Sequence, residues 1–308
     1  MIDSAQGYVQ YNNTFIHQVW STNLILSLYD ATVLAYIANT DYEGEIKNQG
    51  DEVIIRQRPT ININDYEKGG TLVHQRPEAS TISLLIDKAK YFDFVLDNID
   101  EHQTDIQLMS EFSDDASEQM KIEIDTDVLQ TIYALPHASN QGIAAGVESG
   151  DIDLGAEGDP VELTKENILD TIIDSGTVLD EQNCPESDRF CIIPPWASGM
   201  IKKSDLKDAS MTGDGTSALR SGRLGMIDRF TLYNSNNLYK YLDSSTYCWN
   251  IMCGHKMALT FAAQMTEMDT LKAESTFGKI VRGLNVYGFQ VVKPEALATI
   301  YASKGTYT

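Results

Sequence analysis

The segment from Glu52 to Leu96 constrains the fold most, because it holds two long extended stretches that each contain a proline. Alternating apolar and polar residues predict one strand over Glu52–Ile63 and a second over Thr71–Leu96. Pro59 and Pro77 cannot donate to a β-ladder, so neither strand belongs in the middle of a sheet. Turn-forming residues between the two stretches predict that they form a hairpin.

A hairpin of this length is too long for a single chain to cover. Twelve extended residues span roughly 40 Å at about 3.3 Å per residue, which exceeds the core of a modest domain. An isolated hairpin is only marginally stable in water. We therefore expect the hairpin to project and to lie on another molecule; the alternative is an ordinary meander in a β-sandwich.

The period of the apolar residues changes after the hairpin, to one in every three or four positions. No glycine or proline occurs from Asp97 to Leu135, and Pro136 ends the run. The pattern predicts one helix over about residues 102–135, roughly 45 Å long. Its polar face carries a row of carboxylates: Glu111, Asp114, Asp115, Glu118 and Glu123.

The charge of the chain is strongly negative and unevenly distributed. Its 45 Asp and Glu against 23 Lys and Arg give a net charge of −22, which argues against nonspecific binding to DNA phosphates. Acids and bases balance from Glu45 to Lys90, whereas Asp97–Asp127 has Lys121 as its single base. This asymmetry suggests that the two segments meet, within one chain or between chains.

The rest of the chain alternates helices, strands and loops, which predicts an α+β fold. Glycine and acids predict a loop over His137–Pro160, and Thr164 is a predicted N-cap for the next helix. Further predicted elements are a buried strand over Arg189–Ile193, a helix over Trp196–Leu206, and an alternation of strands and one helix over 224–234, 248–253, 257–265, 280–284 and 286–292. An amphipathic helix is expected near Ile16–Leu24.

No pattern of catalytic or redox chemistry is present in the sequence. The four cysteines (184, 191, 248 and 253) lack the spacing of a zinc or thiol redox motif, and the five histidines are scattered. The longest apolar runs are too short to cross a bilayer. The start of the chain lacks a basic and apolar leader, so we expect a cytoplasmic origin.

One acidic loop partly fits the frame of a calcium-binding loop. Oxygen ligands would come from Asp151, Asp153, Glu157, Asp159 and Glu162. Gly155 occupies the fifth position and Ala156 stands where the sharp turn needs glycine, so the fit is poor. An acidic, calcium-dependent binding protein is the alternative function, and an acidic surface loop is the simpler interpretation.

Three stretches resemble the major capsid (coat) proteins of tailed bacteriophages, which have the Hong Kong 97 fold. They are Asn39–Arg56, Gly254–Ala262, and Thr276–Gly288 followed by Val291–Pro294, and they occur in the order typical of this family. The resemblance covers nearly the whole chain. It implies an N-terminal arm (1–44), an extended loop (45–97), a peripheral domain with a spine helix (98–136 and 251–308) and an axial domain (137–250).

The resemblance also implies a function and a set of partners. The chain would self-assemble into pentamers and hexamers of an icosahedral shell that encloses double-stranded DNA without sequence-specific binding. It would need a separate scaffolding protein and a portal protein, and it would have no enzymatic activity, cofactor or membrane association. Assembly would take place in the cytoplasm of a host bacterium, and the product would be the virion capsid.

Predicted contacts between subunits lie on the extended loop and the spine helix. We expect basic residues of the loop to meet carboxylates of a neighbouring copy. Lys68 lies where some capsids of this fold carry a cross-linking lysine, but no partner asparagine is identified, so noncovalent assembly is expected. The predicted interface residues are Arg56, Arg58, Asp65, Tyr66, Lys68, Gly69, Gly70, Arg76, Glu111, Asp114, Asp115 and Glu118.

Overall fold

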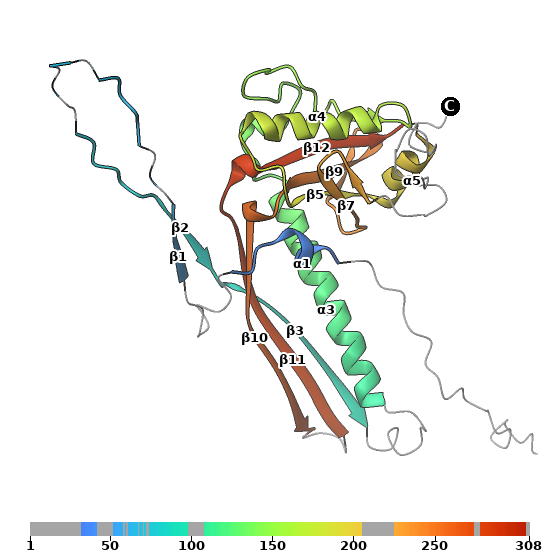
Figure 1. Cartoon of the computed structure of the whole chain (residues 1–308). Helices are drawn as coiled ribbons and strands as arrows, with labels where there is room; N and C mark the ends of the chain where they lie inside the picture. The colour runs from blue at the N-terminus through green and yellow to red at the C-terminus, as the bar shows by residue number, and fades with distance from the viewer. Residues whose placement is uncertain are drawn as a thin grey trace, which may run out of the picture.

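The computed structural model describes residues 32–41, 52–57, 59, 61–66, 68, 69, 71, 74–97, 108–204, 225–273 and 278–305. It has a seven-stranded mixed sheet, a three-stranded sheet with a long helix beside it, and a projecting hairpin (Figure 1). This is the predicted α+β class. Within the described part of the chain, no helix is long and apolar enough to span a membrane.

The larger sheet has the strand order β4-β12-β9-β5-β7-β6, and β8 pairs with β9. Its strands are β4 (Val161–Leu163), β5 (Arg189–Ile193), β6 (Met226–Ile227), β7 (Phe230–Asn234), β8 (Lys240–Asp243), β9 (Thr246–His255) and β12 (Leu297–Lys304). The predicted strand over Arg189–Ile193 is confirmed, and all five of its residues are buried. The helices α4 (Ile168–Glu181) and α5 (Pro195–Lys203) flank this sheet (Figure 1).

The smaller sheet is long, narrow and antiparallel, with the strand order β10-β11-β3. Its strands are β10 (Leu259–Lys272), β11 (Gly278–Val291) and β3 (Lys88–Asp97). The helix α3 (Leu108–Ile132) runs alongside it (Figure 1). The two strands predicted on either side of Asn285 form one continuous strand, because Asn285 itself pairs with Lys90 and Thr266 in the ladder.

The larger of two hydrophobic clusters joins the two sheets where α3 meets the larger sheet. Val128, Leu129 and Ile132 at the end of α3 are fully buried there, with residues from α1 (Leu34–Ile37), α4 and β12. The buried carboxylate of Asp125 binds three segments together. It accepts hydrogen bonds from the backbone N–H groups of Val33 and Leu34, both at 2.9 Å, and from the Asn237 side-chain amide at 2.8 Å.

The long helix predicted over residues 102–135 is confirmed as α3, with an earlier end. It ends at Ile132, and Leu135 lies beyond it with an exposed side chain. Residues 98–107 lie outside the described part of the chain, as do the predicted amphipathic helix near Ile16–Leu24 and the glycine-rich stretch 212–222.

The predicted N-cap of the next helix was displaced by three residues. The cap of α4 is Asn167. The Thr164 hydroxyl instead accepts weak hydrogen bonds from the backbone N–H groups of Glu166 (3.3 Å) and Asn167 (3.4 Å), so Thr164 caps the turn that precedes the helix. The helix predicted over Trp196–Leu206 begins at Pro195 and ends at Lys203.

Three strands of the larger sheet were not predicted. They are β4, β8 and β12. Five of the eight residues of β12 are apolar or aromatic and seven are buried, so it lacks the alternation that marks a half-exposed strand. The four cysteines are buried and form no disulfide.

Candidate subunit interface

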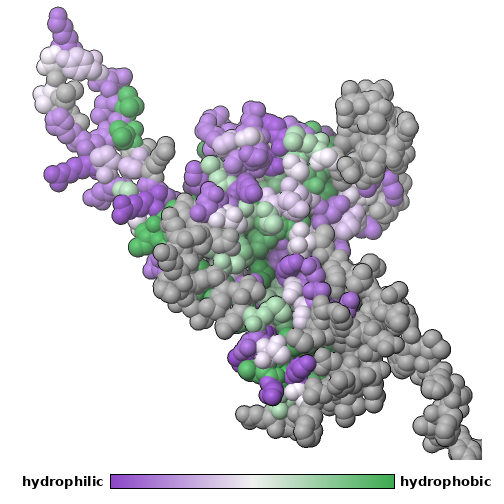
Figure 2. Space-filling view, turned by 60° about the horizontal axis from the view of Figure 1, so that its bottom comes forward, coloured by the Kyte–Doolittle hydropathy of each residue, from purple (hydrophilic) through white to green (hydrophobic). Residues whose placement is uncertain are grey.

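The hairpin is built from two short strands, β1 (Glu52–Arg56) and β2 (Thr81–Leu85), which pair antiparallel over their whole length. The described residues between 57 and 80 belong to no strand and form two extended arms that stand clear of the body (Figure 2). The predicted strands Glu52–Ile63 and Thr71–Leu96 were therefore too long. Pro59 and Pro77 supply no N–H group to a ladder, and the arms lack a third strand to support them.

Beyond the paired strands, a few hydrogen bonds connect the two arms. The Gln75 side chain both accepts from the Asn62 N–H (3.0 Å) and donates to the Asn62 carbonyl (2.8 Å). Nearer the base, the Gln57 N–H donates to the Ser80 carbonyl at 2.8 Å. These contacts are exposed to water, so they keep the arms paired without giving the loop a core.

The base of the hairpin is anchored in a small hydrophobic cluster of its own. Ile55, Leu84 and Ile86 are buried there. They pack against Ala262 and Val286 of the smaller sheet and against Val292, which directly follows β11. Gly288 makes this approach possible, because a Cβ on it would overlap the carbonyl oxygen of Leu85. The hairpin is thus rigidly mounted at one end and free at the other.

The second predicted strand divides at Ile86 and Asp87. β2 ends at Leu85, and β3 begins at Lys88 and pairs with β11 from Lys88↔Tyr287 to Asp97↔Gly278. The alternating pattern continues through the break, so the sequence could not reveal that the chain changes partner.

Apolar side chains point into solvent along the arms. Ile63 is 92% exposed, and Ile61 and Tyr66 are also exposed. The alternation placed Ile61 and Ile63 on the same side as Ile55, but Ile55 alone of the three is buried in this subunit. Figure 2 shows a small hydrophobic patch on one arm of a mostly hydrophilic loop.

The predicted interface residues of the loop are exposed wherever the structure describes them. Arg58 and Gly70 lie outside the described residues. Arg56, Lys68 and Arg76 make no ion pair with another described residue. The exposed residues of this group are Arg56, Asp65, Tyr66, Lys68, Gly69 and Arg76.

The smaller sheet has one covered and one open face. α3 covers the face that carries Phe94, whose ring meets that of Phe112 edge-on at 5.9 Å. The opposite face carries Tyr91 and Val95, both largely exposed, beside the exposed ion pair of Arg282 with Asp269 at 2.9 Å. We call the face of Tyr91, Asp93, Val95, Leu271 and Arg282 the open sheet face. The sequence did not predict it, because the alternation of β3 shows two faces without revealing which one a helix covers.

The acidic face of α3 is partly used within the subunit. Asp127 pairs with Lys88 at 2.7 Å and accepts a hydrogen bond from the Tyr287 hydroxyl at 2.9 Å. Burial raises the pKa of Asp127, but these two bonds and the positive charges of Lys88 and Lys90 outweigh it, so the net pKa is lowered. This carboxylate therefore holds α3 to β3 and β11.

The four predicted carboxylates at the other end of α3 differ in their availability. Glu118 pairs with Lys121, one turn further along the helix, and the half-buried Asp115 is engaged within the chain. Glu111 and Asp114 are exposed and make no ion pair with another described residue. The hairpin extends away from α3 (Figure 1), so the subunit does not bring its loop cations and these carboxylates together.

The structure does not gather the carboxylates of the acidic loop around one point. Asp153 accepts a hydrogen bond from the Gly155 N–H at 2.9 Å, and the backbones of Ala156 and Asp159 bond to each other. Among the described residues, no group of three or more His, Cys, Asp or Glu side chains is placed to hold a metal ion. The geometry therefore lends no support to the calcium alternative.

Comparisons with known proteins find the fold in phage particles. No family model matches the chain, and no curated protein matches it in sequence. Among solved structures, a chain of Mycobacterium phage Che8 is 23% identical, with a TM-score of 0.74 over 94% of this chain and 97% of that one. Chains from the capsids of Cyanophage P-SCSP1u (15% identical, TM-score 0.70) and Ralstonia phage GP4 (12%, 0.67) each match over 99% of both chains. The chain has the fold of phage capsid chains. The fold that the sequence resemblance implied is thereby confirmed.

Proposed function

We propose that this chain is a major capsid protein that assembles into the pentamers and hexamers of a phage shell. The observation that carries the proposal is the hairpin, which is firmly mounted at its base and has apolar side chains exposed along its arms. A two-stranded ribbon with side-chain cross-links cannot bury these residues by itself. A second copy of the chain provides a surface that can.

The open sheet face is the part of a neighbour that suits the hairpin best. It offers the ring of Tyr91 and the side chains of Val95 and Leu271 to the isoleucines of the arms. Asp93 and Asp269 on this face give the loop cations carboxylates to meet. Each subunit then gives one hairpin and receives one, so the contact propagates around a ring and from ring to ring.

The charge distribution suits a contact in which loop cations meet carboxylates of a neighbour. A subunit with a net charge of −22 repels its copies at long range. Arg56, Lys68 and Arg76 place positive charges from the base to the tip of the projecting hairpin, and they make no ion pair with another described residue. We infer that these cations, with Arg58, fix the register of the contact more than they add to its affinity.

The division of the chain follows from the same proposal. Residues 1–44 form an N-terminal arm, 45–97 the extended loop, 98–136 and 251–308 the peripheral domain, and 137–250 the axial domain. The loops of the axial domain close the rings. A scaffolding protein and a portal protein take part in assembly in the host cytoplasm, and the finished shell surrounds double-stranded DNA without reading its sequence.

Electron microscopy of the purified chain, with and without its scaffolding protein, tests the function. We expect rings or closed shells for the unmodified chain. The charge-reversed variant Arg56→Glu, Arg58→Glu should give folded subunits that do not close shells. Lys256→Glu, on an exposed residue far along the chain from the loop, is the control and should assemble normally. Normal shells from the double variant would contradict the proposed contact, and dispersed monomers from the unmodified chain under all conditions would contradict the function.

A further inference from the structure

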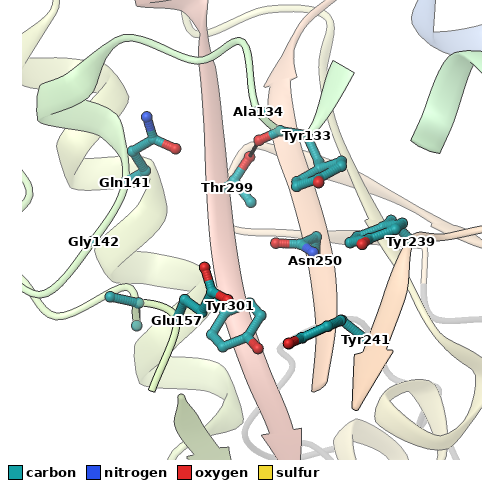
Figure 3. Close-up of a pocket in the computed structure, with 12 residues that line it drawn as sticks. Tyr133, Ala134, Gln141, Gly142, Glu157, Tyr239, Tyr241, Asn250, Thr299 and Tyr301 are labelled. Atoms are coloured by element: carbon teal, nitrogen blue, oxygen red, sulfur yellow. Dashed lines mark hydrogen bonds between the residues drawn. The ribbon is translucent and has the colours of Figure 1, made fainter. Parts of the chain in front are cut away.

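A hollow of about 440 Å³ lies where the larger sheet meets the turn after α3, apart from the hairpin and the open sheet face. Four tyrosines from three segments line it: Tyr133, Tyr239, Tyr241 and Tyr301 (Figure 3). The rings of Tyr133 and Tyr239 stack in parallel, with centroids 4.4 Å apart and planes 6° apart. The volume is within the range of small-ligand sites, which begins at about 300 Å³.

Strand pairing, hydrogen bonds and one close backbone approach hold these walls together. Tyr301 on β12 lies beside Asn250 on β9 in the antiparallel ladder, and the Asn250 N–H donates to the Tyr239 carbonyl at 3.1 Å. Gly155, with a φ of +79°, lets the loop approach β12, because a Cβ there would overlap the carbonyl oxygen of Tyr301. The Tyr301 hydroxyl is held by Asp243 at 3.2 Å. The hollow is therefore rigid on three sides.

A buried amide points into this space without a protein partner. Asn250 is 5% exposed, yet its side-chain amide makes no hydrogen bond with any other described residue. Its amide atoms are not among the fully enclosed atoms without a hydrogen bond, so they are open to the hollow, where a partner from outside the chain can bind them. The neighbouring Thr299 differs, because its hydroxyl donates to the Tyr133 carbonyl at 3.0 Å.

The charge of the lining indicates the sign of the charge that such a partner carries. Glu157 lines the hollow, and none of the described lining residues is Lys, Arg or His. Burial, followed by the neighbouring Tyr239 and Glu157, raises the pKa of Tyr133. The lining thus presents electron-rich tyrosine rings beside one carboxylate, a combination that attracts cations.

We propose that this hollow binds a guanidinium group. A guanidinium is planar and stacks on aromatic rings, which suits walls made of tyrosine better than a compact ammonium does. Its N–H groups are donors for the Asn250 carbonyl oxygen and the Glu157 carboxylate. The group comes either from a free small molecule or from an arginine side chain of another chain. The proposal rests on the hollow alone and holds whether or not the chain forms shells.

The test is equilibrium dialysis of the full-length chain against propylguanidinium, with the neutral isostere propylurea as the matched ligand. We expect saturable binding of propylguanidinium at one site per chain and none of propylurea. Glu157→Gln and Tyr241→Leu should each weaken binding by about fivefold, the scale of one charge contact or one cation–π contact. Tyr247→Leu, on an exposed tyrosine of β9 outside the hollow, should leave it unchanged.

A variant with increased affinity makes the test independent of misfolding, because loss of the fold can only weaken binding. Gln141→Glu adds a second carboxylate to the lining and should strengthen binding of propylguanidinium by about threefold. Equal binding of both ligands, or unchanged binding in Glu157→Gln and Gln141→Glu, would overturn the proposal. Assembled particles distinguish the two sources, since binding retained in particles indicates a free ligand and binding lost on assembly indicates an arginine of a neighbouring chain.

Discussion

The exposed isoleucine at the end of the hairpin gives the sharpest test of the shell contact. Ile63 is 92% exposed in the subunit, so its side chain contributes almost nothing to the stability of the isolated chain. In the proposed shell it is buried on the open sheet face of a neighbour. Ile63→Ala removes three carbon atoms, worth at most about 2.4 kcal/mol at roughly 0.8 kcal/mol for each buried methylene.

That free energy converts directly into an assembly concentration. Each subunit gives one hairpin, so each subunit added to a shell loses this contact once. A loss of about 1–2 kcal/mol per subunit raises the critical concentration for assembly by about 5- to 30-fold, since 1.4 kcal/mol corresponds to a factor of ten. The free energy of unfolding of dispersed subunits should change by less than about 0.5 kcal/mol.

Sedimentation of particles from a series of subunit concentrations, at constant scaffolding protein, measures the critical concentration. Urea unfolding of dispersed subunits measures the stability. Ile173→Ala, on an exposed isoleucine of α4, is the matched control and should leave the critical concentration unchanged. If Ile63→Ala assembles at the same concentration as the unmodified chain, Ile63 is not buried between subunits and the proposed contact is wrong.

Two further perturbations test the mounting of the hairpin and the electrostatics of the larger sheet. Gly288→Ala should destabilise the subunit by about 1–3 kcal/mol, because its Cβ overlaps the Leu85 carbonyl oxygen and pushes the hairpin base outward; urea unfolding measures the loss, and Gly199→Ala, where a Cβ meets nothing within 4 Å, should cause none. Burial raises the pKa of Asp180, but hydrogen bonds from Arg189 and Arg229 outweigh it and lower the net pKa. The stabilisation by Asp180 is therefore present above the ordinary carboxyl pKa of 3.8 and is lost in the acidic window below it, as pH falls through the lowered folded-state pKa. Asp180→Asn should flatten the dependence of the urea midpoint on pH in that window, and an unchanged slope would show that the pair does not stabilise the fold.

The buried guanidinium of Arg189 illustrates a feature that the sequence could not reveal. Arg189 was predicted only as the first residue of a buried strand. It is almost completely buried, and it donates to Asp180 at 2.7 Å and to the carbonyls of Pro185 (2.8 Å) and Cys184 (2.6 Å). These partners lie on α4 and on the loop before β5, and nothing in the local pattern marks them as a set.

Local chemistry determined the elements whose cause lies within a few residues. The run without glycine or proline and its three-to-four-residue period predicted α3, and the prolines with alternating residues predicted an extended hairpin that stands away from the body. The excess of carboxylates and the lack of metal or nucleophile motifs argued against nucleic-acid affinity and catalysis. Each of these inferences depends on backbone propensity or composition, which the sequence states directly.

The tertiary structure alone decided which segments are partners. The alternation that runs from Thr81 to Leu96 does not show that the chain leaves β1 at Ile86 and joins β11 about 190 residues later in the sequence. The open sheet face exists because α3 covers one side of β3 and β11 and leaves the other, and the tyrosine hollow exists because three distant segments meet at β12. Pairing over such distances depends on the packing of the whole chain, whereas the period of a strand records only that one of its faces is apolar.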